Sequence, residues 1–142
     1  MAADNDIVPG LAPVFDAVIE RGAPVTVGRL AIGGQRVHVP VTGGKFSGEG
    51  VFGKIVGGSE TLFDRRNGTS VVEAVYYIEN AAGAVARAMG TGYRTDTGDF
   101  VGIRMSMLFE ADADGPLSHL AESAFVAEQV KGANLMTIWR IV

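Results

Sequence analysis

The ionisable residue best placed to do chemistry is Glu73, inside the apolar run Val71 to Glu79. In an extended strand its side chain shares a face with Val71, Val75 and Tyr77. A carboxylate that points into a barrel from that face is poorly solvated when ionised, which suits a general acid or base. If this face points inward, Glu73 is predicted to be a catalytic acid or base. The alternative is a structural Glu73 that pairs with an arginine at the surface.

Tyr76 and Tyr77 are adjacent, so they point to opposite faces of the same strand and one of them must face inward. An inward tyrosine can donate a hydrogen bond or a proton to a developing oxyanion. Both tyrosines are therefore candidate catalytic residues. The alternative is a core tyrosine whose hydroxyl is satisfied by the protein itself.

The run Gly102 to Glu110 places Arg104 and Glu110 on one face. There Arg104 would hold a substrate carboxylate while Glu110 takes or gives a proton. The opposite face carries Ile103, Met105, Met107 and Phe109 and is more plainly apolar. If that second face is the inner wall, Arg104 and Glu110 are solvated.

Three further side chains are candidate substrate contacts. Trp139 is either a stacking wall for an aromatic ligand or part of the core. Asp64 either lies at the mouth of a barrel or fixes the turn before Gly68. His38 either contacts a ligand or lies on a solvated face, and with His119 it is one of only two histidines. A metal site would need both histidines and a carboxylate, so no metal is predicted.

Glycine separates short runs of strand-forming residues, since 20 of the 142 residues are glycine. About nine strands are predicted, rich in Val, Ile, Thr, Phe and Tyr. They cover Pro13 to Glu20, Val25 to Ile32, Arg36 to Thr42, Gly50 to Val56, Val71 to Glu79, Ala84 to Met89, Gly102 to Glu110, Phe125 to Val130 and Leu135 to Val142.

Helix signals are few. Gly83 interrupts the alanine-rich segment before Met89, so Glu79 to Gly83 is predicted as a hairpin turn. Leu117 to Ala127 is compatible with a short helix or with a strand. We expect an all-β fold with little helix: a flexible N-terminus over residues 1–10 and one antiparallel barrel of eight to ten strands, lipocalin-like in size, over 11–142.

Several short motifs follow one another along the chain: Pro40 to Gly48, Val56 to Glu60, Asp64 to Gly68, Glu73 to Tyr76, Phe109-Glu110 and Ile138 to Val142. Their order resembles the family catalogued as domain of unknown function 3237. The resemblance implies a small single-domain β-barrel. The sequence departs from the family's common residues at Glu60-Thr61, at Asn67, at Met105 to Leu108 and at His119 to Ala121, each a position expected to touch a pocket.

Composition excludes several classes of protein. With 47% hydrophobic and 20% charged residues the chain is globular, and a net charge of −4 disfavours nucleic-acid binding. The absence of cysteine excludes disulfides, thiolate nucleophiles and cysteine-based metal sites. No leader, no membrane-spanning run and no nucleotide motif is recognised, so we expect a cytoplasmic protein with no cofactor.

The sequence predicts a cofactor-independent lyase or isomerase that acts on a small apolar or aromatic metabolite, with or without a carboxylate, inside the barrel. Decarboxylation, elimination, proton transfer and cyclisation all belong to this class. Two alternatives stay open: a barrel that binds a small hydrophobic ligand without chemistry, and a structural or oligomeric protein with a filled interior. The expected partner is a small molecule, with neither nucleic acid nor membrane, and self-association is left open.

Overall fold

The computed structural model describes residues 8–48, 50–65 and 68–142. In chain order the described residues form nine strands, with one short 3₁₀ helix between the seventh and eighth strands. They are β1 (Leu11–Arg21), β2 (Val25–Arg29), β3 (Gln35–Gly48), β4 (Val51–Asp64), β5 (Thr69–Asn80), β6 (Val85–Thr95), β7 (Gly102–Ala111), η2 (Ser118–Glu122), β8 (Phe125–Val130) and β9 (Met136–Ile141).

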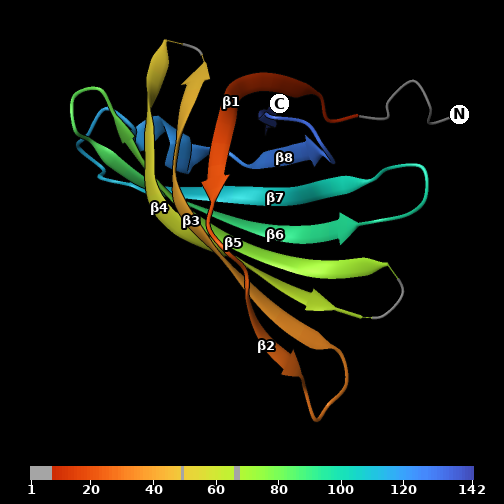
Figure 1. Ribbon diagram of the computed structural model, residues 1–142. Helices are drawn as coiled ribbons and strands as arrows, with labels where there is room; N and C mark the ends of the chain where they lie inside the picture. Colours follow the sequence, from red (N-terminus) through yellow and green to blue (C-terminus); the bar gives the residue numbers. More distant parts are fainter. Residues whose placement is uncertain (1–7, 49, 66–67) are drawn as a thin grey trace, which may run out of the picture.

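The sheet closes on itself. Strand neighbours run in the order β1-β9-β8-β7-β6-β5-β4-β3-β2, and β1 also pairs with β3. Every pairing is antiparallel. The result is an eight-stranded barrel with β2 as an extra strand that extends away from it along β3 (Figure 1). The predicted all-β barrel is confirmed.

Alternation along the strands decides which side chains fill the barrel. On β5 the even-numbered residues from Ser70 to Ile78 are buried, and the odd-numbered residues lie on the outer face. Phe15, Phe46, Phe109 and Phe125 also lie in the core, where Phe109 and Phe125 meet edge to face with ring centroids 4.9 Å apart.

Two of the strands are longer than predicted because glycine pairs lie within them. The predicted runs Arg36 to Thr42 and Gly50 to Val56 ended beside Gly43-Gly44 and Gly57-Gly58, whereas β3 and β4 each continue through the pair. At Gly44, with φ at +136°, a Cβ would lie 2.0 Å from the Val18 carbonyl oxygen. Here glycine permits a close approach of the neighbouring strand, and it does not end the strand.

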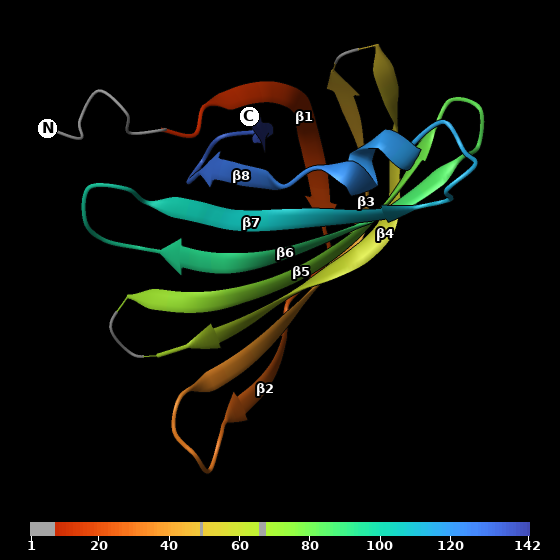
Figure 2. The ribbon, with the colours of Figure 1, turned by 180° about the vertical axis from the view of Figure 1, so that it is seen from behind.

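The short helix η2 closes one end of the barrel. Leu117 and Leu120 are buried there, close to the hairpin turn that joins β5 to β6 (Figure 2). That turn is the one predicted: Asn80 Oδ1 accepts hydrogen bonds from the Ala82 and Ala84 amides. The segment Leu117 to Ala127, which the sequence left open, contains this helix and then the start of β8.

Two sequence-based expectations lie wholly or partly outside the described residues. Most of the predicted flexible N-terminus, residues 1–10, falls outside them, and so does Asn67, a position where the sequence departs from the family's common residue. Within the described part of the chain, no helix is long and apolar enough to span a bilayer.

Candidate functional site

The centre of the barrel is packed. The space left among its apolar side chains is about 20 Å³, lined by residues such as Phe46, Ile78 and Met107. That volume is near the size of a single water site. The expectation that a metabolite binds in the centre of the barrel is therefore wrong, because large side chains fill it. Polar groups gather instead at the end away from η2.

Glu60 is the buried acidic residue of the site, with only 3% of its surface exposed. The Arg21 guanidinium donates two hydrogen bonds to its carboxylate, with Nε 2.6 Å from Oε1 and Nη2 2.9 Å from Oε2. The Tyr76 hydroxyl donates a hydrogen bond to Oε2. Buried charge is costly unless it is paired in this way. We call Arg21, Glu60 and Tyr76 the buried triad after its two buried members, Glu60 and Tyr76, since the Arg21 side chain is 27% exposed.

Two irregularities in strand pairing bring the buried triad together. Between Ile55 and Gly57 the pairing of β4 with β5 shifts, so Val56 is an extra residue and the alternation reverses after it. Glu60 consequently faces inward. A second shift, opposite Glu20 and Arg21, places Arg21 beside Val41 on the inner face.

Burial and charge alter the acid–base behaviour of the buried triad. Desolvation raises the pKa of Tyr76 well above its usual value of 10.0, and the negative charge and hydrogen bond of Glu60 raise it further. For Arg21, burial lowers the pKa, but the hydrogen bond and charge of Glu60 outweigh burial and the pKa is raised. Tyr76 is thus held as a hydrogen-bond donor and Arg21 as a cation.

We expect Tyr76→Phe to destabilise the protein by about 1–2 kcal/mol near neutral pH, because Glu60 loses a donor. The deficit should shrink as the pH rises above about 10. Since the folded state raises the pKa of Tyr76, it keeps a proton that the unfolded chain loses there, so this contribution to stability fades with rising pH. Urea unfolding of wild type and variant across this range measures the deficit.

The control is Tyr77→Phe, which removes a hydroxyl from the exposed neighbour on the outer face. Near neutral pH it should cost no more than about 0.5 kcal/mol. A Tyr76→Phe deficit that does not shrink as the pH rises would contradict the assignment of the high-pH effect to Tyr76.

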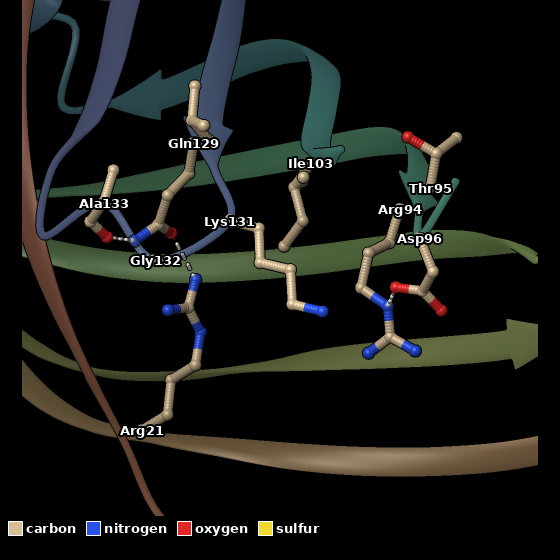
Figure 3. Close-up of a pocket in the computed structure, with 11 residues that line it drawn as sticks. Arg21, Arg94, Thr95, Asp96, Ile103, Gln129, Lys131, Gly132 and Ala133 are labelled. Atoms are coloured by element: carbon tan, nitrogen blue, oxygen red, sulfur yellow. Dashed lines mark hydrogen bonds and ion pairs between the residues drawn. The ribbon is translucent and has the colours of Figure 1, made fainter. Parts of the chain in front are cut away.

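Arg21 connects the buried triad to a cleft of about 490 Å³ at the mouth of the barrel (Figure 3). Its Nη2 also donates to Gln129 Oε1 at 2.8 Å, and Gln129 Nε2 donates to the Ala133 carbonyl at 3.1 Å. The remaining cleft residues come from β6, β7, β8 and the connections at this end. They are Arg94, Thr95, Asp96, Gly102, Ile103, Val130, Lys131 and Gly132.

Charged groups converge on this cleft. Figure 3 shows the Lys131 ammonium between the Arg21 and Arg94 guanidinium groups, with Asp96 beside Arg94. The Arg94 Nε lies 3.7 Å from Asp96 Oδ1, beyond hydrogen-bonding distance. It is buried, and no hydrogen-bond partner for it is found in the described part of the chain.

The structure separates the predicted catalytic residues. Tyr76 faces inward as one of the two tyrosines had to, whereas Glu73 and Tyr77 lie on the exposed outer face. Glu110 is also outside, where it pairs with Arg87 at 3.0 Å. Acid–base roles inside the barrel are therefore wrong for Glu73, Tyr77 and Glu110, since their strands turn the other face inward.

The predicted substrate contacts lie elsewhere as well. Arg104 is exposed, paired with Glu128 at 2.7 Å and stacked over Phe100, so the alternative in which Ile103 to Phe109 forms the inner wall is the correct one. Trp139 lines a groove on the outer surface. His38 is half-buried between β2 and β4, outside the cleft.

Asp64 lies nearer the cleft. It ends β4 opposite Ser70, and Ser70 is opposite Arg94 on the next strand, so it belongs to this end of the barrel. It does not line the cleft itself. Among the described residues, no group of three histidine, aspartate or glutamate side chains is arranged to hold a metal ion.

Sequence reasoning missed Arg21, Glu60, Arg94, Asp96, Gln129 and Lys131. One signal pointed to Glu60: the pair Glu60-Thr61 departs from the family's common residues. Arg21 lay one residue beyond the predicted strand Pro13 to Glu20.

The fold and the site define a class: small closed antiparallel β-barrels with a packed centre and a charged cleft at one mouth. The chain belongs to the family described as protein of unknown function DUF3237, whose model matches residues 9–141. The predicted resemblance is thereby confirmed. The comparison with curated proteins found no match.

Several solved structures share the fold. A conserved protein of unknown function from Rhodopseudomonas palustris is 23% identical, with a TM-score of 0.83 over 96% of this chain and 100% of the other. A beta-barrel like protein from Acinetobacter baumannii is 21% identical, with a TM-score of 0.81 over 96% and 97%. A structure described as an enzyme from Penicillium herquei is 19% identical, with a TM-score of 0.77 over 96% and 97%.

Proposed function

We propose that this protein is a cofactor-independent enzyme of the isomerase or lyase type, which moves a proton on a small metabolite bound in the cleft at the barrel mouth. The observation that carries the proposal is the cleft itself, where a carboxylate, Asp96, and an arginine held by a buried carboxylate line one space of about 490 Å³. Pockets of this size accommodate small organic ligands.

Arg21 is positioned to stabilise negative charge on the substrate. Its Nε and Nη2 are occupied by Glu60 and Gln129, while Nη1 donates no hydrogen bond to any described residue. The bidentate contact with Glu60 fixes the plane of the guanidinium, so Nη1 is preorganised to donate to an oxyanion in the cleft. On the interior side, the Tyr76 hydroxyl donates a hydrogen bond to Glu60 and so helps to hold the carboxylate that orients Arg21.

Asp96 is the carboxylate of the cleft wall. Its backbone amide donates to the Gly68 carbonyl at 2.9 Å, which fixes its position beside Arg94. In the proposed reaction Asp96 takes a proton from a carbon next to a carbonyl, and the electron pair of that C–H bond moves onto the carbonyl oxygen as an enolate facing Arg21. If the enolate is conjugated with a neighbouring C=C bond, return of the proton to the far carbon of that system re-forms the carbonyl and completes an isomerisation. If the carbon next to the deprotonated one carries a leaving group, the enolate electrons re-form the carbonyl and a C=C bond while the leaving group departs with its bonding pair, which completes an elimination.

A second candidate is a barrel that binds a ligand without chemistry. It is favoured by the burial of Glu60 and Tyr76 behind Arg21, which leaves Asp96 as the carboxylate among the residues that line the cleft. Asp96 is also close enough to Arg94 to act only as its counter-ion. The two candidates differ in whether Asp96 exchanges protons with a bound ligand.

Proton exchange in heavy water tests the proposal. Aryl 2-oxo acids such as phenylpyruvate, and 1,3-diketones, are incubated with the protein, and loss of the signal from the hydrogen next to the carbonyl is followed by NMR. We expect faster exchange with wild type than with buffer, and a rate about 10²- to 10⁴-fold lower in Asp96→Asn, the usual effect of removing a general base.

Asp99→Asn is the matched control, an exposed carboxylate in the same connection between β6 and β7, outside the cleft. Its rate should equal that of wild type. If no compound in the series exchanges faster with wild type than with Asp96→Asn, the proposal is overturned in favour of the binding barrel.

A further inference from the structure

We propose that the cleft is selective for a monocarboxylate, whose anionic group binds between Lys131 and Arg94 while its apolar part lies against Ile103 and Val130. This inference names the substrate class of the site. It rests on the proposed function only in treating the bound carboxylate as a substrate, because the selectivity itself is a property of binding.

The charge of the cleft supports a single anion. Three cationic side chains line it, Arg21, Arg94 and Lys131. Glu60 neutralises Arg21 through two short contacts, and Asp96 is the counter-ion near Arg94. Three positive charges against two negative charges leave one positive charge for a ligand to balance. A second carboxylate on the ligand would be desolvated without a partner.

Arg94 provides independent evidence for a missing acceptor. Its Nε is buried and unpartnered within the described part of the chain, although buried N–H groups in native proteins almost always have a hydrogen-bond acceptor. Asp96 Oδ1, at 3.7 Å, is too far away to serve. The Nε itself has no surface open to the cleft, so a ligand oxygen would meet the exposed part of the Arg94 guanidinium, whose side chain is 40% exposed.

Lys131 is held over the cleft by its own backbone. Its amide donates to the Val101 carbonyl at 3.0 Å, and the turn after it is closed by the Ala133 amide donating to Val130 at 2.9 Å. Its ammonium group forms no ion pair with a described residue. These bonds fix the backbone from which the exposed Lys131 side chain extends, and its charge is available to an anion that arrives from solvent.

The rest of the cleft excludes a fully polar ligand. Ile103 and Val130 give it an apolar wall beside the charges, and their strands pair directly at this end of the barrel. An amphipathic acid, with one carboxylate and an apolar or aromatic body, matches both parts. Inorganic phosphate or a small dicarboxylate matches only the charged part.

Cinnamate and cinnamamide are the probes, because they have nearly the same shape and differ in charge. Binding is followed through the backbone amide signals of Gly132 and Ala133 in NMR titrations. We expect wild type to bind cinnamate at least about tenfold more tightly than cinnamamide. Lys131→Met should weaken cinnamate about ten- to a hundredfold, the usual effect of losing a hydrogen bond to a charged group, and leave cinnamamide unchanged.

Lys45→Met is the control, an exposed lysine on β3 outside the cleft, and it should bind both probes as wild type does. 4-Carboxycinnamate, with its second carboxylate, should bind no more tightly than cinnamate. Equal affinity for the acid and the amide, no saturable shift with cinnamate, or a Lys131→Met variant with unchanged cinnamate affinity would each overturn the inference.

The variants also separate this inference from the proposed function. Asp96→Asn should slow proton exchange about 10²- to 10⁴-fold but retain the preference for cinnamate over cinnamamide. If wild type shows that preference and no exchange, the proposed reaction fails and the monocarboxylate site stands. If exchange occurs but the charged and neutral probes bind alike, the reaction stands and the monocarboxylate site fails.

Discussion

Replacing Gly58 with alanine is expected to destabilise the barrel by about 3–5 kcal/mol. Gly58 lies opposite Tyr76 in the pairing of β4 with β5 and has φ at +141°. An added Cβ would lie 2.0 Å from the Val75 carbonyl oxygen and 3.0 Å from the Tyr76 Cα. Relief of this clash requires β4 and β5 to separate, and Glu60 moves with β4.

Gly57→Ala is the matched control in the neighbouring residue. The atom nearest to its added Cβ is the Val41 carbonyl oxygen at 3.9 Å, an ordinary contact. Its stability should stay within about 1 kcal/mol of wild type. Urea midpoints of the two variants measure the contrast, and equal midpoints would show that the close approach at Gly58 is not what constrains these strands.

Glu60→Leu should cost about 2–4 kcal/mol, because Arg21 then keeps its charge without a partner and the Tyr76 hydroxyl loses its acceptor. The lower part of that range applies if Arg21, whose side chain is 27% exposed, turns into the cleft. The double variant Arg21→Met, Glu60→Leu should recover more than half of the loss, since apolar residues often replace a buried ion pair at little cost.

Chemical denaturation of both single variants and the double variant completes this cycle. Strictly additive losses would contradict a coupled pair. Glu128→Gln, which removes the partner of the largely exposed Arg104, is the control and should cost no more than about 1 kcal/mol.

The barrel could be predicted from the sequence because alternation and turn residues are local signals. On β7 the inner face consists of Ile103, Met105, Met107 and Phe109. Four apolar side chains on one face of a strand predict burial of that face without knowledge of the neighbouring strands. On β5 both faces are apolar in sequence, and the inner one includes Ser70 and Ala74. The outer face, with Val71, Val75 and Tyr77, is also apolar, so alternation alone leaves open which face of this strand points inward. Small inner residues make room for Tyr76.

The site could not be predicted because it depends on features of the pairing between strands. The extra residue Val56 reverses which side chains of β4 face inward, and no local pattern near Gly57-Gly58 indicates it. Arg21 and Glu60 are 39 positions apart, and Arg21 and Gln129 are 108 apart. Only closure of the sheet brings them together.

That closure also constrains the order in which the barrel can form. Strand β1 is synthesised before the other strands and pairs with β3 and with β9. Of these two partners, β9 is the last strand along the chain. The strands from β3 to β9 pair mostly with their neighbours in sequence and can form as successive hairpins. Pairing of β1 with β9 instead closes a loop of more than a hundred residues, which is a slow step of high contact order. Until the ribosome has released β9, β1 is held on one side only, and the nascent sheet has an open edge that chaperones or other chains can occupy.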